Sequence, residues 1–88
     1  MDGMLITNDK GYAIVEAEYD KNGNVIKESY FGTDGELIIN NDGFAVIEYE
    51  YDISENIVKE KYFGTDGSGI EYEYDEYGNK IKEILLLK

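Results

Sequence analysis

The sequence predicts an all-β protein: an antiparallel meander of three repeated β-hairpins in one twisted sheet, curled into a partial barrel. Two observations predict this fold. One segment is written three times along the chain, and the stretches between turn signals alternate apolar and polar residues with the period of a strand. No stretch shows a helical period of useful length. The 88 residues suit a single domain spanning 1–88.

The repeat is clearest around a strand, a tight turn and a returning strand. Residues 11–20 match residues 43–52 at an offset of 32, and the match continues from 30–35 to 62–67. A third copy of the turn, within 74–83, belongs to a shortened unit. The repeat units therefore run from about 4 to 35, from 36 to 67 and, truncated, from 68 to 88.

Turn dipeptides such as Asn22-Gly23, Asp34-Gly35 and Asp42-Gly43 separate the expected strands. These strands cover residues 4–7, 12–20, 24–31, 36–39, 44–52, 56–63, 69–75 and 79–87. Full closure of the barrel would join residues 84–87 to residues 4–7 and hide both sheet edges.

The hairpin turns can close in two ways. A two-residue loop gives opposite-charge pairs in every unit, whereas a three-residue loop with a glycine bulge places Glu16 opposite Glu28. Opposite charges across strands are stabilising and like charges are destabilising, so the pattern favours the two-residue loop. The Asp20-x-x-Gly23 spacing also suits the bulged alternative. The favoured register gives the pairs Tyr19–Ile26, Glu18–Lys27, Val15–Tyr30, Tyr51–Val58, Glu50–Lys59, Glu48–Lys61, Ile47–Tyr62, Tyr74–Ile81, Glu73–Lys82 and Ile70–Leu85.

This register defines a tyrosine-rich apolar face and an outer face of glutamates and lysines. The outer face is also expected to carry apolar residues at its far end, namely Tyr12, Ile14, Phe31, Phe44, Val46 and Phe63. Most tyrosines are expected in the core, with Tyr12 and Tyr77 exposed. The apolar face includes Glu28, Glu60 and Glu83. We expect a tyrosine or lysine partner for each, because a catalytic centre would not recur once per unit.

Composition excludes several classes of function. The chain has no cysteine and no histidine, which removes the usual nucleophiles, general bases and soft-metal ligands. We therefore assign no catalytic, cofactor-binding or metal-binding residue and expect no enzyme. Asp20-x-Asn22-x-Asn24 resembles the start of a calcium loop, but its glycine comes one place early and Phe31 occupies the position of the final glutamate. Turn chemistry explains these residues without a metal.

The net charge of the chain restricts the kinds of molecule that it can bind. Twenty acidic residues face eight lysines, for a net charge of −12, so direct binding to nucleic acid or to an anionic membrane is not expected. No leader or membrane span is recognisable, and a complete chain would be cytoplasmic. A protein partner with a basic surface would be attracted. The candidate binding surface consists of Glu16, Glu18, Asp20, Glu48, Glu50, Asp52, Glu55, Glu71, Glu73, Asp75 and Glu76.

Three motifs carry a family resemblance: Gly-Tyr-Ala, Tyr-Asp-x-x-Gly-Asn and Tyr-Phe-Gly-Thr-Asp-Gly. They resemble tandem repeats of bacterial surface and envelope-associated proteins, many from Firmicutes, and are distantly similar to the YD repeats of the Rhs type. The resemblance implies architecture and no functional residues. Unit two departs from it, with Ser54-Glu55 where the other turns have glycine.

Two functions follow as hypotheses. The first is a non-enzymatic repeat module that binds a protein or a surface ligand. The alternative is a stand-alone acidic mimic of nucleic acid that blocks a basic nucleic-acid-binding protein, as anti-CRISPR or anti-restriction proteins do. Neighbouring strands lie about 4.8 Å apart, so rows of glutamates could present closely spaced negative charge. The open sheet edges also allow a homodimer.

Overall fold

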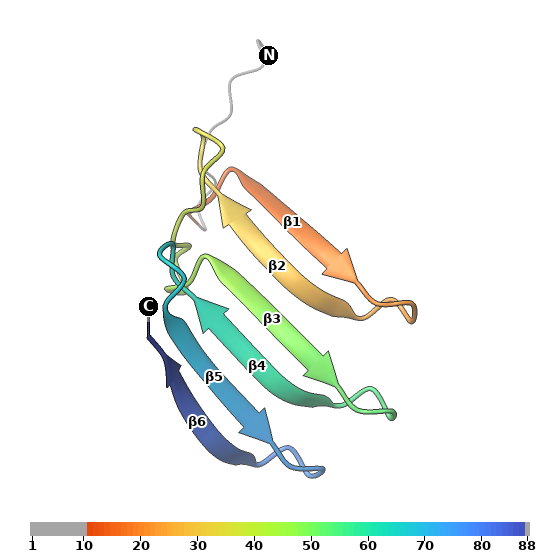
Figure 1. Ribbon diagram of the computed structural model, residues 1–88. Coiled ribbons are helices and arrows are strands. Elements are labelled where there is room, and N and C mark those ends of the chain that lie inside the picture. The colour runs from red at the N-terminus through yellow and green to blue at the C-terminus, as the bar shows by residue number, and fades with distance from the viewer. Residues whose placement is uncertain (1–10, 88) are drawn as a thin grey trace.

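A computed structural model describes residues 11–87 of the protein. They form one antiparallel sheet in which each strand pairs with its neighbours in sequence (Figure 1). The strands are β1 (Ile14–Tyr19), β2 (Val25–Phe31), β3 (Val46–Tyr51), β4 (Ile57–Phe63), β5 (Gly69–Tyr74) and β6 (Lys80–Leu86). The all-β meander of three hairpins is thus confirmed. Within the described residues, no helix is long and apolar enough to cross a bilayer.

Two expected strands need comment. Residues 4–7 lie outside the described part of the chain. The strand expected at 36–39 is wrong, because this segment forms an isolated bridge between Leu37 and Phe31 and a backbone hydrogen bond that the Ile38 N–H donates to the Tyr30 carbonyl, without a continuous ladder. Turns begin at Gly32 and again at Asn40, which leaves too little chain between them for a paired strand.

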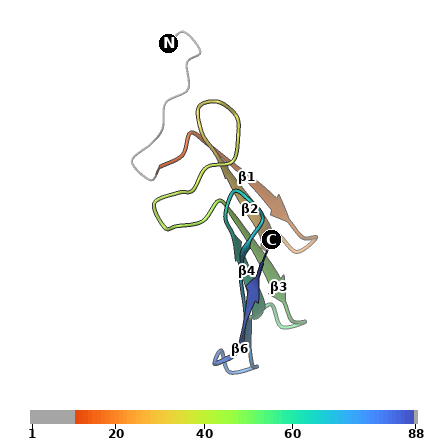
Figure 2. The same ribbon diagram turned by 60° about the vertical axis from the view of Figure 1, so that its left-hand side comes forward.

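The sheet is a single open layer, as Figure 2 shows from the side. β1 and β6 lie at opposite edges, and no strand among residues 11–87 pairs with the outer side of either. The sheet is not closed into a barrel: closure requires the two edge strands to meet, and here four strands lie between β1 and β6.

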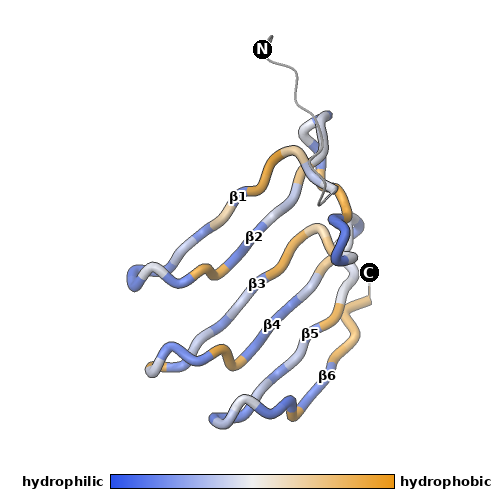
Figure 3. Tube along the Cα trace, turned by 180° about the vertical axis from the view of Figure 1, so that it is seen from behind, coloured by the Kyte–Doolittle hydropathy of each residue, from blue (hydrophilic) through white to orange (hydrophobic). Residues whose placement is uncertain are grey.

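The buried interior is correspondingly thin. Among the described residues, only Ala45 and Ile47 are buried apolar side chains. Residues expected on a core face remain open to solvent, including Tyr19, Ile81 and Leu85. Figure 3 shows hydrophobic residues near the strand ends and hydrophilic residues along the middle of the strands. Because no second layer among residues 11–87 covers either face, the strands are held together mainly by contacts with neighbouring strands.

A row of aromatic rings runs across one face of the sheet, from the first hairpin to the third. Tyr12, Tyr30, Phe44, Tyr62 and Tyr72 meet edge to face, with ring centroids 4.8–6.0 Å apart. Such contacts contribute about 0.5–1.5 kcal/mol each beyond the area they bury. The row also corrects the expected faces, since Tyr12 and Phe44 lie on the tyrosine side and not on the glutamate side. Tyr12 is half-buried, whereas Tyr77 is exposed as expected.

One turn geometry recurs throughout the sheet. In the first hairpin the Asp20 amide donates to the Asn24 carbonyl at 2.9 Å, and the Gly23 amide donates to the Asp20 carbonyl at 3.1 Å. The fourth residue of this turn has a positive φ, which glycine adopts without steric cost. The same paired bonds close the turns that begin at Gly32, Asn40, Asp52 and Asp75.

The hairpin loops therefore have three residues, and the predicted two-residue loop is wrong. The predicted pairing of most strand residues is nevertheless right, because each loop is followed by a bulge. Tyr19 pairs with Val25 and not with Ile26, whereas Glu18 pairs with Lys27 as expected. Ile26 is the extra, unpaired residue, and Val58 and Ile81 are the extra residues of the other hairpins. The bulge moves the register by one residue, so that the glutamate–lysine pairs align. Beyond the bulges the predicted pairs are confirmed, and those of Tyr19, Tyr51 and Tyr74 are wrong.

Gly78→Ala tests the turn geometry. A Cβ at Gly78 would meet nothing within 4 Å, so the only cost is the left-handed backbone at φ +85°. We expect a loss of about 1–2 kcal/mol in the free energy of unfolding, measured by urea denaturation. Tyr77→Ala in the same turn is the control, because Tyr77 is 81% exposed and has no positive φ. An equal loss in both variants would contradict the account.

Candidate functional site

A cleft lies between the first and second hairpins. β2 and β3 pair only over Lys27–Glu48, Glu28–Ile47 and Ser29–Val46, and then separate toward the hairpin turns. β4 and β5, by contrast, pair at five positions. The separation of β2 from β3, visible in Figure 1, leaves an open cleft of about 650 Å³.

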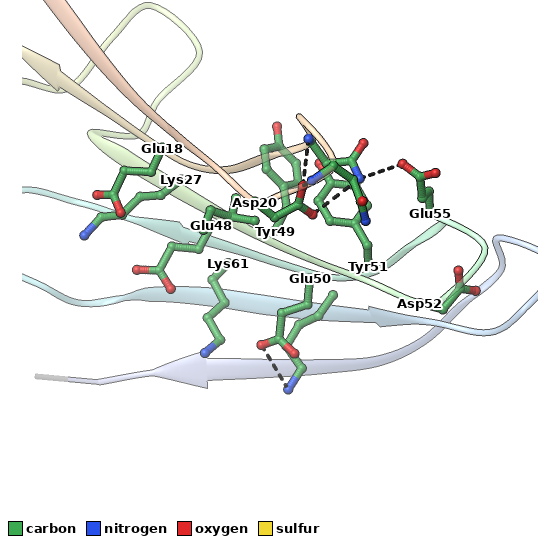
Figure 4. A pocket seen from close by; sticks show the side chains of 14 residues that line it. Glu18, Asp20, Lys27, Glu48, Tyr49, Glu50, Tyr51, Asp52, Glu55 and Lys61 are labelled. Carbon is green, nitrogen blue, oxygen red and sulfur yellow. Dashed lines mark hydrogen bonds and ion pairs between the residues drawn. The ribbon is translucent and has the colours of Figure 1, made fainter.

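Two hydrogen bonds tie the hairpins together across this cleft. The Tyr51 hydroxyl donates to the Val25 carbonyl at 2.6 Å. The Asn24 side-chain amide donates to Glu55 Oε1 at 2.8 Å, the dashed line that ends at Glu55 in Figure 4. Glu55 has the left-handed conformation, with φ 66°, at the position that glycine occupies in the other turns. The departure of unit two from the repeat therefore supplies a contact between hairpins.

The cleft brings together six of the eleven predicted acidic residues. Those six are Glu18, Asp20, Glu48, Glu50, Asp52 and Glu55. Three lysines share the lining, Lys27, Lys59 and Lys61, so carboxylates outnumber ammonium groups two to one. Ile26, Tyr49 and Tyr51 add apolar surface. The cleft thus combines excess negative charge with aromatic rings.

The other predicted acids lie elsewhere. Asp75 and Glu76 line a second hollow, of about 510 Å³, between the second and third hairpins, and Glu55 borders this hollow as well as the cleft. Glu16 lies on the exposed edge strand β1, opposite Ser29. Glu71 and Glu73 lie on β5. The eleven residues are therefore not one continuous patch.

Lysines neutralise part of the glutamate rows. Lys59 Nζ lies 3.9 Å from Glu50, 3.6 Å from Glu71 and 4.0 Å from Glu73, and Lys61 Nζ lies 3.9 Å from Glu71. Glu71 is buried, with 7% of its surface exposed. Its carboxylate contacts Lys59 and Lys61 within the sheet and is too buried to contact a partner.

The turn aspartates are structural as well as charged. One oxygen of Asp20 accepts the backbone amides of Asn22 and Asn24, both at 2.9 Å. The Asn24 amide is the main cause that lowers the pKa of Asp20 below its usual value. The equivalent amides of Asn56 and Asn79 lower the pKa of Asp52 and Asp75. All three carboxylates therefore stay ionised well below neutral pH and keep the hairpin turns negative.

Two of the glutamates on the tyrosine face accept tyrosine hydroxyls, as expected. Tyr30 donates to Glu28 at 2.9 Å, while Tyr62 and Tyr74 donate to the same oxygen of Glu60 at 3.2 and 2.8 Å. Burial, followed by these bonds, raises the pKa of Tyr74 to about 12. A cation–π contact involves another tyrosine: Lys80 Nζ lies over the Tyr72 ring, 3.9 Å from its centre.

Sequence reasoning missed the residues that join one hairpin to the next. Asn24, Tyr49 and Tyr51 were not assigned to the site, and Tyr51 was expected to pack in a core. The one available signal was the loss of glycine at Ser54-Glu55, which marks the second turn as different. A contact between residues 31 apart leaves no periodic pattern in the sequence.

The described residues that line the cleft hold no cluster of metal-ligating side chains. Among residues 11–87 no three histidine, cysteine or acidic side chains converge as metal ligands. Four of the six cleft carboxylates, those of Asp20, Glu50, Asp52 and Glu55, contact turn amides, Lys59 or Asn24. Comparison with known proteins adds no family, since no family model matches the chain and no curated protein or solved structure matches it significantly.

Tyr51→Phe tests the tie across the cleft. The variant loses the bond to the Val25 carbonyl, and we expect the free energy of unfolding to fall by about 1 kcal/mol. Tyr19→Phe is the matched control, because Tyr19 holds the same repeat position but is 60% exposed on an edge strand. Urea denaturation measures both variants. Equal stability of Tyr51→Phe and the parent would contradict the assigned bond.

Titration tests the Glu60 contact. The folded-state pKa of Tyr74, about 12, exceeds the ordinary value of 10.0. The contribution of the protonated Tyr74 hydroxyl to the free energy of unfolding is therefore complete below pH 10 and is lost as the pH rises through 12. Glu60→Gln removes the negative charge, so tyrosine ionisation, followed by ultraviolet absorbance, should begin at lower pH. Glu83→Gln, at the equivalent position of the next repeat, should leave the profile nearly unchanged.

Proposed function

We propose that this protein is a non-enzymatic binding module whose cleft between the first two hairpins accepts a basic segment of a protein partner. The observation that carries the proposal is the gathering of Glu18, Asp20, Glu48, Glu50, Asp52 and Glu55 around one cleft that also contains tyrosine rings. A lysine or arginine side chain suits this lining, because its charge meets carboxylates and its stem covers apolar surface.

The turn aspartates support the same proposal. Asp20 and Asp52 are held by backbone amides, so their charge stands at the mouth of the cleft without loss of side-chain entropy when a partner binds. The net charge of −12 adds long-range attraction for a basic partner and speeds the encounter.

The nucleic-acid mimic has less support. A mimic needs rows of uncompensated negative charge, whereas Lys59 and Lys61 stand within the glutamate rows and contact Glu50, Glu71 and Glu73. The carboxylates of Asp20, Asp52 and Glu55 instead bind turn amides or Asn24, and they lie at the hairpin turns that border the cleft. We therefore favour recognition of a short basic segment over imitation of a phosphate backbone.

A fluorescently labelled hexa-arginine peptide provides the probe. We expect saturable binding that weakens with added salt, and backbone amide shifts in nuclear magnetic resonance spectra that cluster at the cleft. The double variant Glu18→Gln/Glu50→Gln should bind several-fold more weakly, since each exposed charge contact contributes about 0.2–1 kcal/mol.

The control is Glu36→Gln/Glu83→Gln, which loses the same charge outside the cleft lining. It should bind nearly as well as the parent. Amide shifts spread evenly over the acidic surface, or equal weakening by both double variants, would exclude the cleft as the binding site. Competition with duplex DNA for a basic DNA-binding protein, with no effect of the cleft variant, would favour the mimic.

A further inference from the structure

Both edge strands of the sheet are open. All six residues of β1 are exposed, and β6 is exposed over most of its length. Val15 on β1 is 44% exposed and Leu85 on β6 is 68% exposed. Neither strand contains proline, and no strand among residues 11–87 covers their outer sides. Open edges of this kind carry unpaired backbone groups that can accept another strand.

The repeat shows what covers the equivalent edges inside the molecule. Residues of β6 correspond to those of β4 at an offset of 23, and residues of β1 correspond to those of β3 at an offset of 32. The outer side of β4 is covered by β5, a strand equivalent to β1. The junction between them includes the pairs Lys59–Glu73 and Tyr62–Ile70.

We propose that the protein associates head to tail, with β6 of one copy pairing with β1 of a second copy in the register of the β4–β5 junction. Transposing that register places Lys82 opposite Glu18 of the second copy, as Lys59 stands opposite Glu73. It also places Leu85 opposite Val15 of the second copy, as Tyr62 stands opposite Ile70.

The contact has the character of the existing junctions. It brings together one opposite-charge pair and two apolar pairs, since the same register places Leu86 opposite Ile14, and it continues the ladder of antiparallel backbone bonds. The two edges that meet are different, so the contact does not close on a two-fold axis, and further copies can add at each end. Because every copy carries a net charge of −12, added salt should strengthen the association by screening this repulsion.

Two edge variants test the proposal without disturbing the hairpins. Val15→Lys places a charge on the β1 edge, and Leu85→Lys places one on the β6 edge. Both positions are at least 44% exposed in the single chain. Ile53→Lys, at a turn residue that is 99% exposed, is the control for an added lysine. Circular dichroism checks that each variant keeps its sheet, and sedimentation velocity measures association.

We expect the parent and Ile53→Lys to form oligomers that grow with protein and salt concentration. Val15→Lys and Leu85→Lys should each remain monomers of 10.0 kDa. Mixed in equal amounts, they should form a one-to-one dimer that does not grow, because one intact β6 meets one intact β1 and the remaining edges both carry lysine.

Three results would overturn the proposal. A parent chain that stays monomeric at high concentration and high salt excludes the contact. Persistent dimers of Leu85→Lys alone would indicate pairing of β1 with β1, and persistent dimers of Val15→Lys alone would indicate pairing of β6 with β6. The peptide-binding test of the cleft is independent of these outcomes and has the opposite dependence on salt.

Discussion

The turn that closes each hairpin is the constraint on which the sheet depends. Its fourth residue must adopt a left-handed backbone, and its first residue, Asp20, Asp52 or Asp75, binds the amides that follow. The bulge that comes next shifts the strands by one residue. Only after this shift do glutamates of one strand stand opposite lysines of the next, so the loop and the bulge together determine the charge pairing of the whole sheet.

A sheet organised in this way does not need a second layer in order to be specific. One face is joined across strands by five aromatic rings, and the other by Lys59 and Lys61 among carboxylates. Each interaction is modest and runs between neighbouring strands, as in other repeat proteins, whose stability is close to a sum of local and nearest-neighbour contributions. The consequence is that, within residues 11–87, no second layer covers either face and no further strand pairs with either edge.

The candidate site forms where the repetition is imperfect. β2 and β3 separate after three pairs, and the second turn has Glu55 in place of glycine. The space between the hairpins is bridged by Tyr51 and Asn24 and surrounded by carboxylates, so the cleft is a product of the differences between units more than of the repeat itself.

The sequence by itself determined the meander, the three hairpins and the glutamate–lysine register, because these depend on local turn chemistry and on a period of two. It also predicted a tyrosine or lysine partner for Glu28, Glu60 and Glu83, and tyrosine hydroxyls donate to the first two. Only the tertiary structure decided that the sheet stays open, that Phe44 joins the tyrosine row, and that six acids meet at one cleft. Those outcomes depend on how hairpins separated by long connections lie beside one another, and no local pattern of residues records that arrangement.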